Sequence, residues 1–256
     1  MALKDIKKAK AKPLMRFVIY GQEGVGKSTL AMGAPNPLYI DIEDGTGQLE
    51  VSRYQWPDGF TAPSYGSFIE ALTEVFREDH DYKTLVIDGF DRLENLIWEM
   101  LCEQSHQQKG KKCASIADAF KGFGEGYAAA AREMRLLCHK LDKIRIKKEM
   151  HIVILAHSTI HKFKNPDGAD FDRFQLRLHD KAGSVLKEWT DVLGYMSFED
   201  GVTSSDHKPK AYSTGRRLIH FERSAAFDAK TRIKLPDLVH VEGPETWQTW
   251  QNLIDV

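Results

Sequence analysis

The chain has 256 residues, enough for one large α/β domain or for a core with small additions. Its formal net charge is −1 and its sequence pI is about 6.8. This balance excludes binding of nucleic acid or of an anionic membrane through an overall excess of positive charge, so any such surface must be local. No apolar run approaches the roughly 18 residues of a membrane span, and the cysteines form no C-x-x-C pair. These features predict a cytoplasmic protein without disulfides and without a membrane partner.

A basic segment, residues 1–14, precedes the first apolar run. We separate it as an N-terminal arm from a domain that covers residues 15–256. Two interpretations of the arm remain open: a solvated leader, which we favour, or a flexible segment that contacts phosphate backbones. Its cations are Lys4, Lys7, Lys8, Lys10 and Lys12.

The segment 15–32 is typical of a strand, a glycine-rich loop and a helix in succession. An apolar run at 17–20 breaks into G-Q-E-G-V-G-K-S, and helical spacing resumes at 29–32. The loop matches G-x-x-x-x-G-K-[ST] with both flanks in place, which predicts a nest of backbone N–H groups for a polyphosphate. Lys27 would reach the β- and γ-phosphates, and Ser28 would hold Mg²⁺. The predicted cofactor-binding residues are Gly21, Gln22, Glu23, Gly24, Val25, Gly26, Lys27, Ser28 and Thr29.

The next apolar run, residues 38–42, predicts a buried strand that ends among acidic side chains. Asp41, Glu43 and Asp44 lie at its carboxyl end. In open parallel sheets, ligands bind at the carboxyl ends of the strands, so a carboxylate here is a candidate general base. The alternative is an acid that caps the following helix.

A second acidic motif, T-L-V-I-D-G-F-D, places Asp88 at the end of another apolar run. In P-loop NTPases this aspartate organises the Mg²⁺ shell, so Ser28 and Asp88 are the predicted metal ligands. Many ATPases have a glutamate directly after it to activate water, whereas this chain has Gly89. Glu43 is therefore the preferred general base, with Asp91 as the alternative.

Apolar periodicity predicts amphipathic helices over 68–76, 90–102 and 128–148. A third buried strand, at 152–156, ends in His157. A polar side chain at that position would lie near the γ-phosphate. Contact with the γ-phosphate could then change the conformation of the segment that follows.

Two polar stretches carry the remaining local concentrations of cations. The first covers 109–121, and the second covers 158–180 and is interpreted as a long polar loop. Cations neutralise phosphates and aromatic faces stack on unpaired bases, so we favour nucleic-acid binding over a simple lid for the second stretch. The residues concerned are Lys109, Lys111, Lys112, Lys162, Phe163, Lys164, Phe171, Arg173, Phe174 and Arg177.

The C-terminal part predicts a helix, then strands at 192–198 and 217–221 that are joined by a polar turn. These strands should add to the sheet as hairpins. Lys230 and Arg232 lie on a later turn, and a short amphipathic helix is expected within 244–255.

In the order of its motifs the chain resembles the RecA-type recombinase ATPases, specifically the small RecA-like ATP-binding proteins of phage recombination modules. The resemblance covers about 15–236. It implies that Glu43, in Y-I-D-I-E, is the catalytic base, that Asp88 serves the Mg²⁺ shell and that both polar stretches bind DNA. At the sensor position, which is commonly glutamine in RecA proteins, this chain has His157.

The resemblance also implies cations that act across a subunit interface. Relatives carry a K-N-R-F-G motif there, and K-T-R-I-K in this chain keeps only its lysine and arginine. Such cations would stabilise transition-state charge in a neighbouring subunit. The implied catalytic set is Glu43, Lys27, His157, Lys230 and Arg232.

We therefore expect an α/β, RecA-like P-loop NTPase fold, a mainly parallel twisted sheet flanked by helices with C-terminal antiparallel strand additions. The resemblance implies a protein that binds ATP and Mg²⁺, hydrolyses ATP, binds single-stranded DNA and acts in phage recombination or strand annealing. It further implies a homo-oligomer, either a ring or a short filament, and the host cytoplasm as location, and it leaves open a single-strand DNA-binding protein as a partner. Two alternatives remain: a small-molecule kinase built on the same loop, and an ATP-gated DNA-binding module with negligible turnover.

Overall fold

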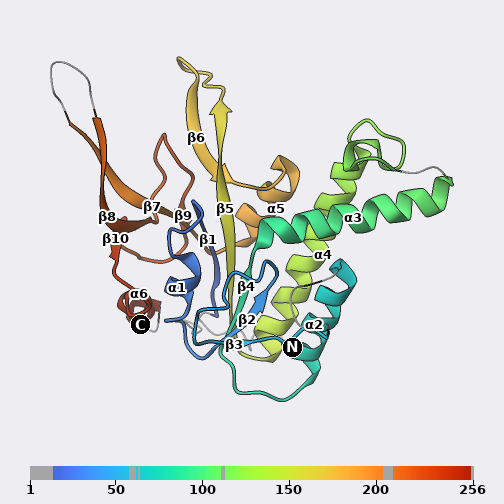
Figure 1. The fold of residues 1–256 in the computed structure, drawn as a ribbon, viewed down its shortest axis with the longest axis horizontal. Coiled ribbons are helices and arrows are strands. Elements are labelled where there is room, and N and C mark those ends of the chain that lie inside the picture. The colour runs from blue at the N-terminus through green and yellow to red at the C-terminus, as the bar shows by residue number, and fades with distance from the viewer. Residues whose placement is uncertain (1–13, 58–61, 63, 111–112, 204–209, 255–256) are drawn as a thin grey trace, which may run out of the picture.

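One mixed β-sheet runs through the part of the chain that the computed structural model describes, residues 14–57, 62, 64–110, 113–203 and 210–254 (Figure 1). Within these residues, ten strands are ordered β10-β8-β7-β1-β5-β4-β2-β3, with β6 paired to β5 and β9 to β7. Their bounds are β1 Arg16–Gly21, β2 Pro37–Asp41, β3 Ser52–Arg53, β4 Thr84–Asp88, β5 His151–Phe163, β6 Phe171–Leu176, β7 Val192–Thr203, β8 Lys210–His220, β9 Lys230–Thr231 and β10 Leu238–Val241.

The parallel core of the sheet consists of β7, β1, β5, β4, β2 and β3. Its central strands are continuous apolar runs because helices cover both faces and leave no side for solvent. In the parallel register, Gly21 at the end of β1 lies beside His157 on β5 and Met196 on β7. The glycine-rich loop therefore starts at the carboxyl edge of the sheet, where ligands of such sheets bind.

Helices cover the two faces of the sheet unequally. One face carries α2, α3, α4 and α5, whereas α1 and α6 cover the other (Figure 1). On the smaller side, the buried ring of Trp247 meets Phe17 edge-on, with ring centroids 5.1 Å apart. The predicted α/β P-loop NTPase class is confirmed. The bounds are α1 Lys27–Ala31, α2 Tyr65–Arg77, α3 Phe90–Lys109, α4 Glu125–Lys147, α5 Asp180–Trp189 and α6 Thr246–Ile254.

Antiparallel strands extend the parallel core at one side. β8 pairs with β7, and β10 pairs with β8. The C-terminal strands therefore add to the sheet as antiparallel neighbours, as predicted. Both strands of the β7–β8 ribbon are longer than predicted, because residues 200–203 also pair with 210–213, beyond an irregularity in the register after Phe198. In the described part of the chain, no helix combines the length and the apolarity that a bilayer crossing needs.

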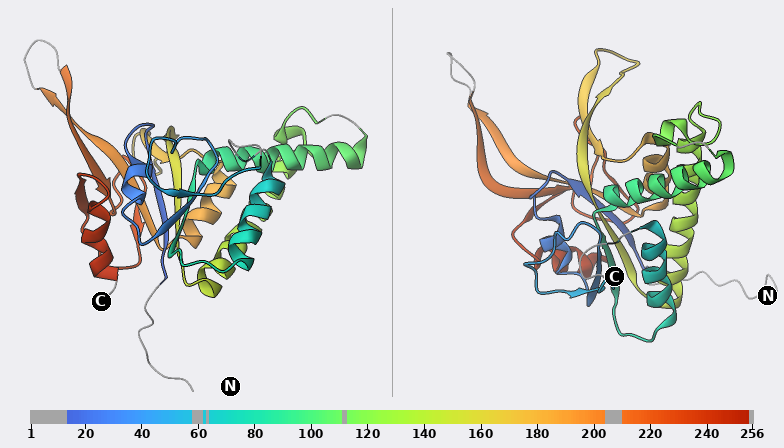
Figure 2. Two further views of the ribbon diagram at one scale, coloured as in Figure 1. Left: turned by 60° about the horizontal axis from the view of Figure 1, so that its bottom comes forward. Right: turned by 45° about the vertical axis from the view of Figure 1, so that its right-hand side comes forward.

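The prediction of a long loop over 158–180 is wrong. β5 continues to Phe163 and returns as β6, with Phe163 opposite Phe171. The connecting turn contains N-P-D-G, and Asn165 Oδ1 accepts a hydrogen bond from the backbone N–H of Asp167 at 3.1 Å, which is the local chemistry of a tight turn. This β5–β6 hairpin and the β7–β8 ribbon both project beyond the carboxyl edge of the sheet (Figure 2).

The first polar stretch is also more regular than predicted. α3 passes its expected end at Cys102 and continues to Lys109, where Gly110 ends the helix in the left-handed conformation, with φ of 62°. Part of this stretch, 111–112, and residues 1–13 of the basic arm lie outside the described residues.

Lys230 and Arg232 lie at the end of the sheet opposite the glycine-rich loop. β9 pairs with the first residues of β7, which lie beside Phe17 near the start of β1. The rest of β1 separates them from the loop by on the order of 13 Å. Lys230 Nζ donates to the carbonyl oxygen of Lys187 at 2.5 Å, and Arg232 Nη1 donates to Asp191 Oδ1 at 2.9 Å. Within one subunit these cations stabilise the amino edge of the sheet, and their action on a neighbour stays a prediction.

Asp191 is the centre of the charged contacts at that edge. It accepts hydrogen bonds from the backbone and guanidinium of Arg16, with Nη2 to Oδ1 at 2.6 Å, and from Arg232. Burial opposes ionisation of Asp191, but the bonds from Arg16 outweigh it and lower the pKa. The ionised carboxylate therefore stabilises the fold above the unfolded-state pKa of about 3.9, and this contribution is lost as the pH falls through the native pKa.

Asp191→Asn should lower the free energy of unfolding by about 2 kcal/mol at neutral pH, because the charge-assisted bonds to both arginines are weakened. The difference from wild type should shrink below about pH 4, since protonation then removes the same charge from the wild type. Urea denaturation at several pH values measures both quantities, with the exposed Asp237→Asn as control. A difference that does not depend on pH would contradict this role of the charge.

Candidate nucleotide-binding site

A cavity of about 290 Å³ lies at the carboxyl edge of the parallel core, between the glycine-rich loop, the ends of β2 and β4, and His157 on β5. It collects the predicted site residues Lys27, Ser28, Glu43, Asp88 and His157, which come from four separate segments of the chain. The parallel register explains this convergence, because it aligns the carboxyl ends of neighbouring strands. The remaining lining residues are Gly24, Gly26, Thr29, Asp41, Gly45, Gln48 and Leu49.

The loop backbone has features that require glycine. Gly26 has φ of 93°, in the left-handed region that residues with a β-carbon rarely adopt. At Gly21 the reason is a close approach, since a β-carbon there would lie 2.1 Å from the carbonyl oxygen of Met196 on β7. α1 begins directly after the loop, so the N–H groups of its first turn have no partner within the helix. This is the backbone arrangement that binds polyphosphate in proteins with the same motif.

The side chain of Lys27, the first residue of α1, contacts the backbone of the loop. Its Nζ donates hydrogen bonds to the carbonyl oxygens of Gly21 at 3.2 Å and Gln22 at 2.9 Å. Burial lowers the pKa of Lys27, and the nearby carboxylates, Asp88 foremost, oppose this shift. The phosphate oxygens of a bound nucleotide could therefore replace these carbonyl oxygens as hydrogen-bond partners of the ammonium group.

Ser28 and Asp88 form the predicted metal-binding pair. Ser28 Oγ donates to Asp88 Oδ2 at 2.5 Å, and the hydroxyl of Tyr39 donates to the Ser28 carbonyl oxygen at 2.8 Å. Burial raises the pKa of Asp88 to about 6, although the bond from Ser28 opposes the shift. Hydroxyl and carboxylate oxygens are hard ligands that suit Mg²⁺, which takes its other ligands from water and phosphate. The residues therefore fit the expected ion, whose charge would favour the ionised form of Asp88.

Glu43 occupies space that is open because residue 89 is glycine. A β-carbon at Gly89 would lie 2.6 Å from Glu43 Cγ and 2.9 Å from Cδ, and Gly89 has φ of 82°. A glutamate at position 89, as many ATPases have it, would therefore displace the side chain of Glu43. Both the backbone and the neighbouring side chain require glycine.

The turn after β2 is held by Asp41 and presents Glu43. Asp41 Oδ1 accepts the backbone N–H of Glu43 at 3.1 Å, and Oδ2 accepts the N–H and the hydroxyl of Thr46 at 2.8 and 2.5 Å. Trp56 Nε1 donates to the carbonyl oxygen of Asp41 at 3.0 Å. Among the acids at this strand end, Asp41 therefore stabilises the turn, which leaves the carboxylate of Glu43 free for chemistry.

Asp91 connects three segments around the cavity. Its Oδ1 accepts the backbone N–H of His157 at 3.1 Å, and its Oδ2 accepts Nε and Nη2 of Arg177 at 2.8 and 2.6 Å. Arg177 Nη1 also donates to Glu23 of the glycine-rich loop at 2.9 Å. Arg177, at the end of β6, thereby links the hairpin to α3 and to the loop.

These contacts separate the two candidate bases. Burial raises the pKa of Glu43 and the charge of Asp91 adds to this effect, whereas His157 and Arg177 oppose it without reversing the shift. For Asp91, burial acts in the same direction, but the bonds from His157 and Arg177 outweigh it and lower the pKa. Glu43 is therefore the stronger base of the two, and the geometry favours it over Asp91. Ligand atoms of Glu43, Asp91 and His157 lie within 4.8 Å of one another.

Sequence reasoning missed the place of Arg177. It assigned this residue to a DNA-binding loop, whereas the guanidinium pairs with Asp91 on α3 and with Glu23 of the glycine-rich loop. The partner Asp91 is 86 positions away in the chain, and no local spacing pattern marks such a pair.

Gly89→Ala should displace the Glu43 side chain and lower ATP turnover by at least about tenfold, while nucleotide binding persists, because the clash affects the base and not the loop. Single-turnover hydrolysis and equilibrium nucleotide binding measure the two effects. Gly110→Ala is the matched control, because Gly110 also has a left-handed backbone, with φ of 62°, but a β-carbon there meets nothing within 4 Å. Equal turnover in Gly89→Ala and wild type would show that Glu43 is not held in this position for catalysis.

Comparison with known proteins identifies the family of the chain. The model of the AAA domain family matches residues 14–233, which is most of the chain. No curated protein matches. Among solved structures, the crystal structure of the RadB recombinase aligns with a TM-score of 0.48 and 10% identity, over 89% of this chain and 86% of that chain. The glycine-rich loop, Asp88 and the parallel sheet all lie within the matched segment, and the chain belongs to the AAA domain family of P-loop nucleotide-binding proteins.

Proposed function

We propose that the protein is a Mg²⁺-dependent, RecA-like ATPase that couples ATP hydrolysis to the binding of single-stranded DNA, in recombination or strand annealing. The observation that carries this proposal is that Glu43 lines one cavity with the glycine-rich loop and the Ser28–Asp88 pair. A carboxylate of raised pKa at that place suits a general base for water. Action in a phage recombination module and assembly into a ring or short filament belong to the same proposal.

In the proposed reaction, Glu43 accepts a proton from the water molecule that attacks the γ-phosphorus. A bond forms between the water oxygen and phosphorus, and the bond to the β–γ bridging oxygen breaks. The bridging oxygen keeps the electron pair, so the products are ADP and inorganic phosphate. The loop N–H groups and Lys27 stabilise the charge on the β- and γ-phosphates. When bound at Ser28 and Asp88, Mg²⁺ would supply further charge neutralisation to the same phosphates.

The proposed DNA contact is the outer half of the β5–β6 hairpin. Lys162 and Lys164 are exposed there, and Ile160 keeps 59% of its surface exposed. Exposed cations bind phosphates without regard to sequence, and an apolar surface beside them suits unpaired bases. The other two cations assigned to this stretch are engaged elsewhere: Arg177 pairs with Asp91, and Arg173, which is 6% exposed, pairs with Asp228.

The hairpin is connected to the nucleotide cavity at both of its inner ends. β5 passes His157, which lines the cavity, before it reaches the exposed lysines. β6 returns toward Arg177, which contacts Asp91 and Glu23. A change in phosphate occupancy would therefore act on both strands, and this supports coupling between ATP and DNA.

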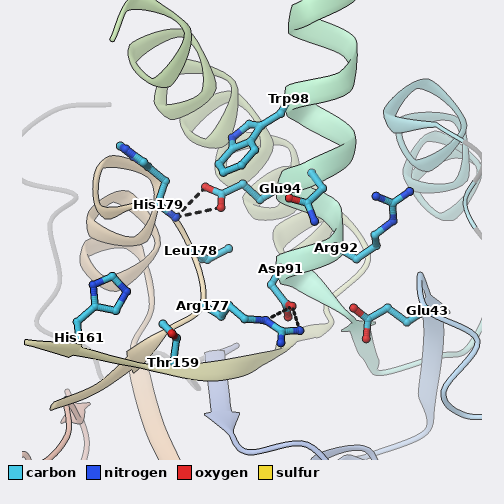
Figure 3. A pocket seen from close by; sticks show the side chains of 11 residues that line it. Glu43, Asp91, Arg92, Glu94, Trp98, Thr159, His161, Arg177, Leu178 and His179 are labelled. Carbon is cyan, nitrogen blue, oxygen red and sulfur yellow. Dashed lines mark hydrogen bonds and ion pairs between the residues drawn. The ribbon is translucent and has the colours of Figure 1, made fainter. Parts of the chain in front are cut away.

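A second cavity favours one alternative, a phosphotransferase. About 360 Å³ in volume, it shares Glu43 with the nucleotide cavity and extends past Asp91, between α3 and the hairpin (Figure 3). Its wall includes Glu94, which accepts the backbone N–H of His179 and whose pKa is raised by burial to about 7. A small acceptor could occupy this cavity next to the γ-phosphate, in which case turnover would need that acceptor and not DNA.

ATP turnover measured with and without single-stranded DNA tests the proposal. Wild type should be stimulated by DNA, and Glu43→Gln should lose at least about a hundredfold in turnover while it still binds ATP, since a general base contributes about 10² or more. Glu50→Gln, an exposed glutamate after the same strand, is the control.

The double variant Lys162→Ala/Lys164→Ala should keep its basal turnover and lose most of the stimulation by DNA. Stimulation that is unchanged would remove the hairpin from the proposal. Turnover in Glu43→Gln equal to wild type would favour the ATP-gated module, and turnover that ignores DNA would favour the phosphotransferase.

Arg177→Gln should move the acid limb of the turnover profile to higher pH. Glu43 must be ionised to act as a base, so activity is lost as the pH falls through its pKa. Arg177 is one of the charges that lower this pKa, and its removal also leaves the charge of Asp91 less compensated. Arg216→Gln, which changes an exposed arginine that pairs with Glu199, should leave the limb in place. A shift in the opposite direction would exclude Glu43 as the titrating group.

A further inference from the structure

β8 brings an arginine against the glycine-rich loop. A β-carbon built on Gly26 would lie 3.5 Å from Arg217 Cδ and 3.6 Å from Arg217 Nε. Arg217 occupies a fixed register in the sheet, opposite Phe198 on β7 and Val241 on β10. Its position beside the loop therefore follows from strand pairing on both sides and not from a flexible segment.

The guanidinium of Arg217 has no partner in the described part of the chain, where neither an ion pair nor a side-chain hydrogen bond engages it. The preceding residue differs, since Arg216 Nε lies 2.6 Å from Glu199 Oε2. Arg217 is exposed to solvent. An unpaired cation that is held against an anion-binding loop is suited to receive charge from a ligand of that loop.

The strand order decides which part of the ligand this cation meets. Asp88 and Glu43 come from β4 and β2, on one side of β1, whereas Arg217 comes from β8, on the other side. A nucleotide whose γ-phosphate lies toward Asp88 and Glu43 extends its nucleoside end toward β7 and β8. Arg217 is thus placed for the inner end of the phosphate chain.

We infer that Arg217 binds the α-phosphate of the nucleotide within the same subunit. This inference rests on nucleotide binding at the glycine-rich loop, which is part of the proposed function, but not on hydrolysis. Both ATP and ADP contain the α-phosphate, so Arg217 should hold substrate and product equally. Residues on the other side of β1, by contrast, should distinguish the two.

Equilibrium binding of Mg²⁺-ADP and of a non-hydrolysable Mg²⁺-ATP analogue, followed by calorimetry, tests this inference. Arg217→Ala should weaken both by about tenfold to a hundredfold, as expected for loss of a charge-assisted bond. Arg217→Lys should recover part of the affinity, and Arg216→Ala should remain within about twofold of wild type. Melting temperatures of all variants check that β8 is intact.

Three results would overturn the inference. Unchanged affinities in Arg217→Ala would show no contact, and a loss confined to the ATP analogue would place the guanidinium on the γ-phosphate. A loss for adenine nucleotides that is absent for GDP would place it on the base. Failure of the wild type itself to bind either nucleotide would instead contradict the proposed function, so the two failures are distinguishable.

Discussion

The contact between Glu43 and Gly89 is the constraint on which the rest of the site depends. A carboxylate near the γ-phosphate can come from the residue after Asp88 or from the end of the neighbouring strand, but the two positions compete for one volume. This chain fills that volume from β2 and leaves residue 89 without a side chain. The Asp41 turn and the left-handed backbone of Gly89 are then two parts of one arrangement.

The charges around the cavity form a second constraint. Glu43, Asp88 and Asp91 lie near a single buried lysine, Lys27, and three unshielded carboxylates there would raise one another's pKa. Ser28 bonds to Asp88, and Arg177 neutralises Asp91. Among these three acids, Glu43 alone has a carboxylate without a hydrogen bond or ion pair in the described part of the chain, and this supports its proposed role as the general base.

The sequence predicted those parts of the molecule that local patterns encode. The glycine-rich loop and the strand ending in Asp88 depend on residues a few positions apart, and their convergence follows from parallel sheet geometry. The hairpin over 158–180 was missed because polarity was given more weight than the turn sequence N-P-D-G. Arg177 and Arg217 could not be placed, because their positions depend on pairings across most of the chain.

These two arginines divide the proposed nucleotide site by function. Arg217 belongs to a strand that is paired on both sides, so it offers a fixed charge to the end of the ligand that hydrolysis does not change. Arg177 is shared between Asp91 and Glu23, and a γ-phosphate would compete with both for it. Because Arg177 follows β6, this competition would affect the hairpin and with it the affinity for DNA. By thermodynamic linkage, DNA bound to the hairpin would then change the affinity for ATP by the same factor. Under the proposed function, coupling therefore needs no separate domain, since the hairpin strands themselves reach the cavity.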